Sequence, residues 1–431
     1  MFIDYKTHLF PIHSWANRFL YRWLSCSSTA SYNLERAREL TEQNWERLQT
    51  QERDHVEFCE AFPELVELEL TRACNYTCTH CGTHGLPGDH RINNSAAPMD
   101  IKLLDKLAHE VFPYCRRVSV IGRGEPFMTP RKLLRQFFKY LEMTHTFFDL
   151  ATNGALIDQS LINSMLPVLG NICFSLDAAK PDTYFAIKRS DKFHYVVNNI
   201  KILLKLREAI PADRHRFQLL LCFALRRANH GELIDFLKMA ADLGVDGVYV
   251  LHLLVHFPGM QSETLIGKPE IANPILDLAS KEAEELKLTV FLPAPIDNRP
   301  LYKSRQKNPI TKPVTASRVN CCFLWRSIII RNDGQVFPCS SLHSPYIGNV
   351  KKDSFFNVWN CEKIRQMRIR LDTADPHPAC RRCWFREVSY FESLANEDDF
   401  ALKNVQRSDQ KAYNSTAFSS YPRSGNTANS I

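Results

Sequence analysis

Strand and helix signals alternate along the chain from residue 65 to about residue 293. Apolar runs such as LVELEL, RRVSVIG, FFDLATNG and NICFSLD are followed by segments of helical periodicity, and RFQLLLCFAL, GVYVLHLL and KLTVFLP continue the series. This alternation is typical of parallel strands with helices outside them, in an open α/β sheet or a barrel. In such folds the loops after the carboxyl ends of the strands carry the chemistry.

Capping residues predict where several helices begin. Asp100 is a good N-cap for a helix whose apolar face starts at Ile101. Thr129 and Pro130 are expected to open the next helix, as its N-cap and its first-turn proline. Further helices are expected over residues 158–167, in the stretch up to about residue 209, over 230–243 and near 271–286.

Composition and pattern divide the 431 residues into five regions. We expect a helical N-terminal segment over 1–63, an α/β domain over 64–293, a proline-rich linker over 294–317, a second cysteine-bearing region over 318–395 and a disordered tail over 396–431.

Charge and hydropathy narrow the class of protein. The net charge is +7, but the basic residues are scattered, so the excess favours an anionic ligand or surface and does not indicate nucleic-acid binding. No apolar run of about 18 residues is present, and we expect neither a membrane span nor a signal peptide. Fourteen cysteines in such a chain point to metal ligands or catalytic thiols. We therefore expect a cytoplasmic protein.

Three cysteines, Cys74, Cys78 and Cys81, form a Cys-x3-Cys-x2-Cys pattern in the loop after the first expected strand. A tetrahedral zinc site usually draws on two ligand pairs, whereas iron–sulfur clusters take thiolates at such close spacing. Three thiolates on a four-iron cluster would leave one iron open to a substrate or cofactor. His80 and His84 are rival ligands for that iron, and zinc is the rival metal.

This pattern resembles the signature of the radical SAM enzymes, which follows the first strand of a partial barrel. His80 is a mild departure, since the family often has an aromatic residue before the third cysteine. The resemblance implies that the open iron chelates the amino and carboxylate groups of S-adenosylmethionine. An electron from the [4Fe-4S] cluster would then cleave this cofactor to a 5′-deoxyadenosyl radical, which abstracts hydrogen from a substrate.

Loops after the next three strands are similar to cofactor-binding loops of the same family. GRGEP resembles a Gly-Gly-Glu-Pro loop in which Arg123 replaces the second glycine. Glycines let the backbone approach a cofactor, and the carboxylate of Glu125 can accept from an ammonium group. The alternative interpretation of this loop is a tight turn. The resemblance covers about residues 64–255 and implies cofactor contacts by Gly122, Gly124, Glu125, Pro126, Asn153, Ser175, Asp177 and Arg189.

Four of these implied contacts lie in the segments that follow the third and fourth expected strands. Asn153 lies in a loop similar to a cofactor-supporting loop, although Thr-Asn-Gly is also a good turn. Ser175 and Asp177 alternate at the end of the fourth strand, where a hydroxyl and a carboxylate suit a ribose or the methionine moiety. Arg189 matches a family arginine that can pair with the cofactor carboxylate, and its alternative role is that of a solvated helix-end residue.

A second set of cysteines lies near the C-terminus. RNDG between two β-rich runs predicts a hairpin that brings Cys322 close to Cys339, and Cys321 is the rival of Cys322. The run PACRRCWF adds Cys380 and Cys383. Four such thiols suit a zinc site and a four-iron cluster equally.

This region looks like the SPASM/twitch extension of radical SAM enzymes, because its cysteine spacing is joined by IGNV and a Trp359–Asn360 pair. The resemblance implies one auxiliary [4Fe-4S] cluster, since no cysteine follows Cys383. Its implied ligands are Cys322, Cys339, Cys380 and Cys383. The implied fold is a partial (β/α)6 TIM-like barrel with a small C-terminal α+β cluster-binding domain.

We therefore expect a radical SAM oxidoreductase or a related radical-based modifying enzyme. A small molecule or carbohydrate intermediate is the favoured substrate, and an electron donor such as flavodoxin or ferredoxin is implied. One alternative is a maturase of a peptide or protein side chain, and another is a non-catalytic zinc or iron–sulfur redox sensor. Candidate substrate contacts are Arg226, Asp246, Tyr249, His252 and His256, none of which is assigned as catalytic.

Overall fold

The structure is a computed structural model that describes residues 28–85, 97–120, 123–211, 216–255, 258–293, 295–296, 321–340, 344–373 and 375–381, with side chains from residue 37 and without that of Arg381. The predictions for Gly122, His256 and Cys383 lie outside these residues. So do the tail over 396–431 and all of the expected linker except residues 295–296.

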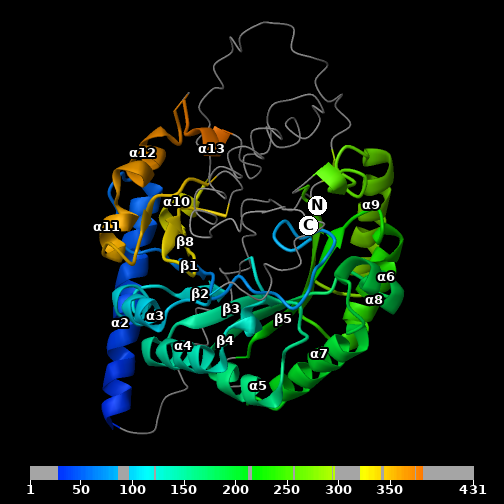
Figure 1. Ribbon diagram of the computed structural model, residues 1–431, viewed down its shortest axis with the longest axis horizontal. Coiled ribbons are helices and arrows are strands. Elements are labelled where there is room, and N and C mark those ends of the chain that lie inside the picture. The colour runs from blue at the N-terminus through cyan, green and yellow to red at the C-terminus, as the bar shows by residue number, and fades with distance from the viewer. Residues whose placement is uncertain are drawn as a thin grey trace, which may run out of the picture.

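One sheet of ten strands organises the described residues, in the order β10-β9-β8-β1-β2-β3-β4-β5-β6-β7 (Figure 1). Strands β1 to β7 are parallel and neighbour one another in chain order. They are β1 (Leu65–Leu68), β2 (Arg117–Val120), β3 (Phe147–Thr152), β4 (Leu169–Ser175), β5 (Gln218–Leu225), β6 (Gly247–His252) and β7 (Val290–Phe291). The predicted parallel α/β arrangement is confirmed, and it brings the carboxyl ends of these strands to one edge.

Helices line the outer side of the curved sheet, as in a partial barrel (Figure 1). They are α3 (Ile101–Glu110), α4 (Arg131–Thr144), α5 (Gln159–Met165), α6 (Pro181–Lys188), α7 (Phe193–Glu208), α8 (Leu233–Leu243) and α9 (Pro269–Glu285). Asp100 caps α3 as predicted and accepts from the Lys102 N–H. The predicted N-cap Thr129 is wrong, because Pro130 occupies that place and Thr129 ends the short 3₁₀ helix η3 (Pro126–Met128).

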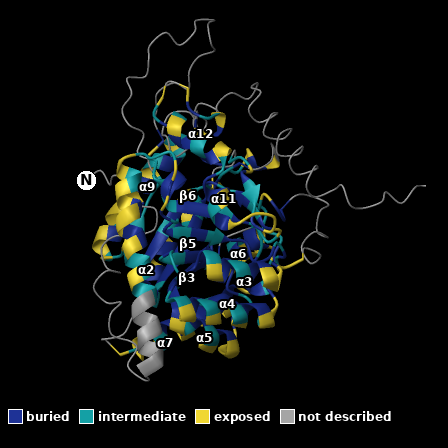
Figure 2. Cartoon of the chain, turned by 90° about the vertical axis from the view of Figure 1, so that its left-hand side faces the viewer, coloured by how far each residue is buried: buried dark blue, intermediate teal, exposed yellow. Residues whose placement is uncertain are grey.

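The core lies between the sheet and these helices, whose outer faces are exposed (Figure 2). Three aromatic rings illustrate its packing. Phe137 of α4 lies 5.7 Å from Phe148 of β3 and 6.2 Å from Phe112, with edge-to-face geometry in both pairs. All three side chains are fully buried, and such burial of apolar surface is the main force that holds helices onto a sheet.

The N-terminal helix α2 (Ser28–Arg53) packs against α4 of the barrel and against residues 323–326 of the C-terminal region. Its Trp45 ring lies between two guanidinium groups, 4.3 Å from Arg116 and 5.0 Å from Arg326. Glu52 of the same helix accepts from Arg326 at 2.5 Å. These contacts tie α2 to both the barrel and the C-terminal region. No helix among the described residues is long and apolar enough to cross a membrane.

The C-terminal region extends the barrel sheet. Strand β8 (Ser327–Ile330) pairs in parallel with β1, and the predicted hairpin to β9 (Gln335–Phe337) is confirmed. Strand β10 (Gly348–Asn349) completes this side. The accompanying helices are α10 (Phe323–Arg326), α11 (Phe355–Trp359), α12 (Glu362–Arg370) and α13 (Pro378–Arg381). The carboxyl end of β8 therefore lies beside that of β1, where the first cysteine loop begins.

Candidate active site

The first cysteine loop follows β1 and carries Cys74, Cys78 and Cys81. The backbone N–H of Tyr76 donates to the Cys74 sulfur at 3.4 Å, and the N–H of His84 donates to the Cys81 sulfur at 3.2 Å. Such donors stabilise negative charge on sulfur. One loop thus supplies three sulfur atoms in a backbone setting that suits the thiolate ligands of an iron–sulfur cluster.

Burial opposes ionisation of these thiols. It raises the pKa of Cys74 to about 12 and the pKa of Cys78 to about 11. The positive charge of bound iron would offset this effect and keep the sulfurs as thiolates. The loop itself is tightly curled, because a Cβ at Gly85 would lie 2.5 Å from the Cys78 carbonyl oxygen.

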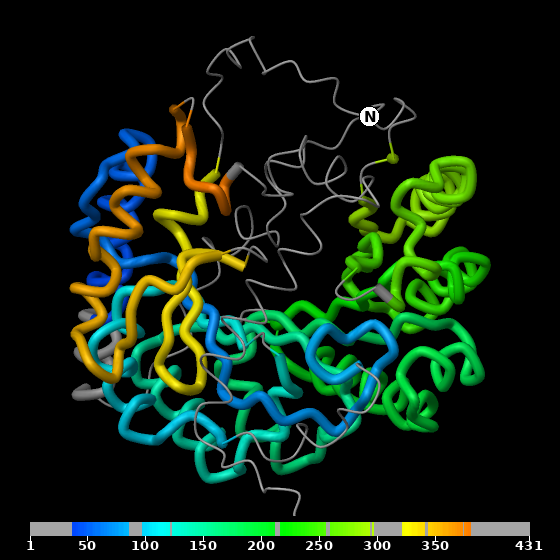
Figure 3. The backbone as a smooth tube through the Cα atoms, turned by 45° about the horizontal axis from the view of Figure 1, so that its top comes forward, coloured from blue at the N-terminus to red at the C-terminus, as the bar shows by residue number. Residues whose placement is uncertain are grey.

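The cysteine loop runs from β1 across the open side of the barrel towards α6 (Figure 3). At its far end the Thr79 N–H donates to the Ile187 carbonyl of α6 at 2.9 Å. The two rival iron ligands have other neighbours. His84 Nε2 bonds the Arg123 carbonyl at 2.7 Å, and His80 Nε2 lies 3.6 Å from a carboxylate oxygen of Asp177.

The loop after β2 packs directly on the start of the cysteine loop. Glu125 donates its backbone N–H to the Ala73 carbonyl at 2.8 Å. A Cβ at Gly124 would lie 2.5 Å from that same carbonyl oxygen and 2.7 Å from the Thr71 carbonyl oxygen. A glycine is therefore needed at residue 124 for these two loops to meet.

The carboxylate of Glu125 is buried and bonded to the loop after β3. It accepts from Thr152 Oγ1 at 2.6 Å, from the Asn153 N–H at 2.8 Å and from the Phe127 N–H at 3.3 Å. An ionised carboxylate has about four acceptor positions, so one is left for a further donor. Burial raises the pKa of Glu125 to about 7, and a cationic donor would favour its ionised form.

Asn153 connects these loops to one another. Its Nδ2 donates to Asn75 Oδ1 of the cysteine loop at 2.8 Å, while its backbone N–H bonds Glu125. The next residue, Gly154, has a φ of 76°, which a glycine adopts without strain. The loops after β1, β2 and β3 thus form one hydrogen-bonded unit.

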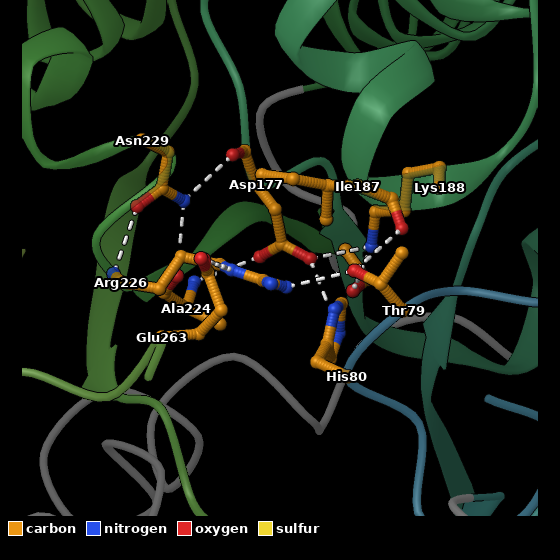
Figure 4. A network of polar contacts seen from close by, with 10 residues as sticks. Thr79, His80, Asp177, Ile187, Lys188, Ala224, Arg226, Asn229 and Glu263 are labelled. Atoms are coloured by element: carbon orange, nitrogen blue, oxygen red, sulfur yellow. Dashed lines mark hydrogen bonds and ion pairs between the residues drawn. The ribbon is translucent and has the colours of Figure 1, made fainter. Parts of the chain in front are cut away.

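Ser175, the last residue of β4, and Asp177, in the loop after it, both contact the buried Lys188 of α6, and Figure 4 shows the Asp177–Lys188 pair. Lys188 Nζ donates to Ser175 Oγ at 2.9 Å and to Asp177 Oδ2 at 2.5 Å. The other oxygen of Asp177 accepts from the Ala224 N–H at 2.7 Å. Asp177 has a φ of 61°, a left-handed conformation that this set of contacts holds in place.

The Lys188–Asp177 pair stays charged despite its burial. Burial by itself raises the pKa of Asp177, but the positive charges of Lys188 and His80 outweigh it and lower the pKa below its ordinary value. Burial likewise acts to lower the pKa of Lys188, and the charges of Asp177 and Cys78 reverse this effect and raise it. The electrostatic network therefore reaches the cysteine loop.

Arg189 lies outside this network. It is the C-cap of α6, has a φ of 54°, and its side chain is exposed. The residue that sequence reasoning missed is Lys188, which is 1% exposed. A signal was available, since Tyr184, Ile187 and Lys188 share the buried face of α6 at helical spacing.

Arg226, one of the candidate substrate contacts, is bonded to the cysteine loop. Its Nη1 donates to Thr79 Oγ1 at 3.0 Å, and its Nε donates to Glu263 at 2.9 Å (Figure 4). Asp246 instead pairs with Arg207, and Tyr249 stacks on Phe291 at 4.5 Å between ring centroids. These contacts of Asp246 and Tyr249 are therefore with residues of the fold. His252 is the last residue of β6.

The second set of thiols contains two adjacent candidates, Cys321 and Cys322, whose surroundings differ. Burial raises the pKa of Cys321, and the neighbouring thiols Cys322, Cys339 and Cys380 raise it further. The groups that act on the pKa of Cys322 after burial are Arg326, Glu52 and Glu64. The neighbours of Cys321 are therefore the expected cluster ligands, whereas Cys322 lies among charged residues of α2, α10 and the start of β1.

Cys322 begins α10 and lies near Arg326, whose charge lowers its pKa against the effect of burial. Cys380 lies on α13 and is buried, and Cys339 Sγ lies 3.4 Å from Ser344 Oγ. Three thiols at the described positions 321, 339 and 380 suit the thiolate chemistry of an auxiliary cluster.

Of the predicted cofactor contacts, six lie at the carboxyl edge of β2, β3 and β4: Gly124, Glu125, Pro126, Asn153, Ser175 and Asp177. Two family models match the chain. Residues 68–210 match the radical SAM superfamily, and residues 321–384 match SPASM, an iron–sulfur cluster-binding domain.

Two kinds of curated relative are similar in sequence. An AdoMet-dependent heme synthase of Methanosarcina barkeri is 23% identical over 340 residues, which cover 76% of this chain and 90% of the relative. A probable GTP 3′,8-cyclase of Saccharolobus solfataricus is 29% identical over 191 residues, which cover 44% of this chain. The match spans 57% of the cyclase.

Two solved structures share the fold. SuiB of Streptococcus suis bound to S-adenosylmethionine has a TM-score of 0.54 at 14% identity, covering 80% of this chain and 75% of SuiB. Native anSMEcpe with bound AdoMet has a TM-score of 0.54 at 16% identity, covering 82% of this chain and 97% of anSMEcpe. These likenesses confirm the partial barrel with a small C-terminal region.

The donor groups agree with the cofactors that these families use, which are S-adenosylmethionine, a [4Fe-4S] cluster and auxiliary iron–sulfur. Cysteine thiols with backbone N–H donors suit the first cluster, and a buried carboxylate with one open acceptor position suits an amino group. The chain is an enzyme of the radical SAM superfamily, with a C-terminal iron–sulfur cluster-binding domain of the SPASM family.

Proposed function

We propose that this enzyme performs radical chemistry on a small molecule, with Cys74, Cys78 and Cys81 as the ligands of its catalytic cluster. The observation that carries the proposal is the direct bonding of the cysteine loop to the Glu125 and Asn153 loops at one sheet edge. When bound there, the cluster and S-adenosylmethionine supply a radical able to take hydrogen from a substrate.

Residues of the loops after β2, β3 and β4 position the cofactor and keep water away from it in this proposal. Gly124 lets the backbone after β2 close onto the cysteine loop, and Glu125 offers its last acceptor position to the amino group of the cofactor. Ser175, Asp177 and Lys188 form a rigid, water-excluding wall after β4. Arg189 stays the predicted partner of the cofactor carboxylate, since the charge of Lys188 is already paired with Asp177.

Cys321, Cys339 and Cys380 are the proposed ligands of the auxiliary cluster, with Cys383 as the predicted fourth. Cys339 and Cys380 raise the pKa of Cys321, whereas Arg326 and Glu52 have the largest effects on the pKa of Cys322 after burial, and this difference in surroundings supports the choice of Cys321. Such a cluster can accept an electron from a substrate radical, and the net reaction is then an oxidation. A flavodoxin or ferredoxin is the proposed reductant of the catalytic cluster.

A small-molecule substrate is supported by the sequence relatives. The names of the heme synthase and of the GTP cyclase both denote chemistry on small molecules. The helix α2 also supports a small-molecule substrate. Peptides often bind by adding a strand to an exposed sheet edge, and α2 is a helix that packs on the barrel.

Anaerobic reconstitution with iron and sulfide tests the proposal. We expect about eight irons per chain, as two four-iron clusters require, and release of 5′-deoxyadenosine after reduction. Transfer of deuterium from a labelled small molecule into 5′-deoxyadenosine would identify the substrate. Stoichiometric zinc without cleavage of S-adenosylmethionine would refute the enzyme, and label transfer only from a peptide would refute the small-molecule class.

A further inference from the structure

A β-turn inside the first cysteine loop joins two of the proposed cluster ligands. The Cys81 N–H donates to the Cys78 carbonyl at 3.0 Å, which closes the turn. Thr79 and His80 are its two central residues. The conformation of this turn sets the spacing and direction in which the two cysteines present their sulfur atoms. Residues that bond the turn from outside therefore influence the position of both ligands.

Thr79 is bonded to the barrel from two sides. Its N–H donates to the Ile187 carbonyl of α6 at 2.9 Å, and its hydroxyl donates to the same oxygen at 3.3 Å. The hydroxyl oxygen accepts from Arg226 Nη1 at 3.0 Å, and Arg226 Nε donates to Glu263 Oε2 at 2.9 Å (Figure 4). This Thr79–Arg226–Glu263 bridge joins the turn to the segments that follow β5 and β6.

The backbone fixes both ends of this bridge. The Arg226 N–H donates to Asn229 Oδ1 at 2.8 Å, and the Arg226 carbonyl accepts from the His230 N–H at 2.9 Å. The Arg227 N–H donates to the Glu263 carbonyl at 2.8 Å. The Arg226 side chain is 6% exposed. A guanidinium shielded from water depends on its partners, so it stays where both Thr79 and Glu263 can be reached.

We propose that Arg226 is a positioning residue of the catalytic cluster, which acts by holding the turn between Cys78 and Cys81. This inference rests on the proposed function, since it needs the three cysteines of the loop to be cluster ligands. The bonds of Arg226 Nε and Nη1 to the protein favour this role over the substrate contact expected from the sequence.

The place of Glu125 explains why such positioning matters. Glu125 belongs to the loop after β2 and is the proposed partner of the amino group of S-adenosylmethionine, whereas the bridge holds the turn from the side of β5 and β6. The cofactor has to fit the Glu125 carboxylate and the open iron at the same time. A shift of the turn relative to Glu125 therefore weakens cofactor binding.

Electron paramagnetic resonance of the reduced, reconstituted holoenzyme, titrated with S-adenosylmethionine, tests this role. Arg226→Met should weaken the apparent affinity at least about tenfold, because it removes the charged donor that bonds Thr79. Arg226→Lys should weaken it less, since a lysine keeps the charge without the fork. The matched control is Arg227→Met, which changes the adjacent, exposed arginine and should bind the cofactor as the wild type does.

A double-mutant cycle assigns the effect to the bridge. Thr79→Val keeps a branched side chain and removes the oxygen that accepts from Arg226. The variant with both Thr79→Val and Arg226→Met should lose less binding free energy than the sum of the two single losses, because each substitution breaks the same bond. Additive losses would overturn the bridge.

Equal affinities in wild type and Arg226→Met would overturn the positioning role, and so would an equal loss in the Arg227→Met control. A purely structural role would lower the stability of Arg226→Met to urea and leave the cofactor affinity of the folded enzyme unchanged, and that result would also overturn it. Iron content shows whether Arg226→Met is folded, and Arg226→Lys keeps the test valid if it is not.

The same samples separate this role from the proposed function. A wild type that binds no cluster at the cysteine loop would refute both together. A wild type that cleaves S-adenosylmethionine, with an unchanged affinity in Arg226→Met, would refute the positioning role alone. Weaker binding in Arg226→Met, with a wild type that binds the cofactor and does not cleave it, would refute the proposed function alone.

Discussion

Lys188 Nζ lies 2.5 Å from Asp177 Oδ2, and both side chains are almost fully shielded from solvent, with exposures of 2% and 1%. This ion pair joins the last residue of α6 to the loop after β4. Charges taken out of water depend on each other, because neither has solvent to stabilise it. The pair therefore fixes the wall of the active site next to His80 of the cysteine loop.

Lys188→Met is expected to lower the free energy of unfolding by about 3–5 kcal/mol, because the Asp177 carboxylate would stay buried without its cation. Urea denaturation of the reconstituted enzyme measures this change. The matched variant is Lys188→Met with Asp177→Asn, in which the amide oxygen still accepts from the Ala224 N–H. We expect the double variant to lose less than the single one, and a strictly additive loss would contradict the coupling.

The parallel order of β1 to β6 could be predicted from local pattern alone, because each apolar run is followed by its own helix and the connection between neighbours is short. The place of β8 could not. Nothing within Ser327–Ile330 says that it pairs with β1, since that contact joins residues far apart in the chain. Tertiary packing decides such edges.

At two places the sequence offers adjacent candidates whose surroundings differ in the folded chain. Lys188 and Arg189 are adjacent cations at the end of α6. Lys188 lies on the buried face of this helix, whereas Arg189 is its left-handed C-cap and is exposed. Cys321 and Cys322 are adjacent thiols before α10, and the start of that helix separates their surroundings. One residue of register changes the face of a side chain, and spacing motifs do not resolve it.

Glu125→Gln is expected to weaken binding of S-adenosylmethionine about tenfold or more. The substitution removes the negative charge that would face the amino group, and hydrogen bonds to charged groups contribute about 1.5–3 kcal/mol. Anaerobic calorimetry on reconstituted enzyme measures the affinity. Thr152→Val is the matched control, because it deletes one 2.6 Å bond to Glu125 and leaves the carboxylate. A larger loss in Thr152→Val than in Glu125→Gln would argue for a purely structural role of this carboxylate.

His145 gives the fold a pH dependence outside the active site. Burial lowers its pKa to about 4 from 6.5, with a further contribution from Arg38. Between pH 4 and pH 6.5 the imidazole of His145 is therefore protonated in the unfolded chain and neutral in the folded chain. The free energy of unfolding falls as the pH is lowered from about 6.5 to 4.

His145→Asn should flatten this part of the stability curve, by about 1–3 kcal/mol between neutral pH and pH 4. Asparagine tolerates the left-handed φ of 55° that His145 adopts after α4, so the backbone is retained. Denaturant unfolding of wild type and variant across this range gives the difference. Parallel curves for the two proteins would show that another group is responsible.

Cys321→Ala is expected to remove the auxiliary cluster, about four of the eight irons, whereas Cys322→Ala should keep both clusters. The physical reason is that the two thiols have different neighbours. Cys339 and Cys380 raise the pKa of Cys321, whereas the charge of Arg326 lowers the pKa of Cys322. Iron analysis and electron paramagnetic resonance of each variant measure the loss. The catalytic cluster is bound by a separate loop, so the Cys321→Ala protein should keep the paramagnetic resonance signal of that cluster. The same signal should be lost in Cys74→Ala, Cys78→Ala and Cys81→Ala. If Cys322→Ala lost the auxiliary iron and Cys321→Ala did not, Cys322 would be the ligand, as the cysteine spacing implies, and the assignment of Cys321 would be wrong.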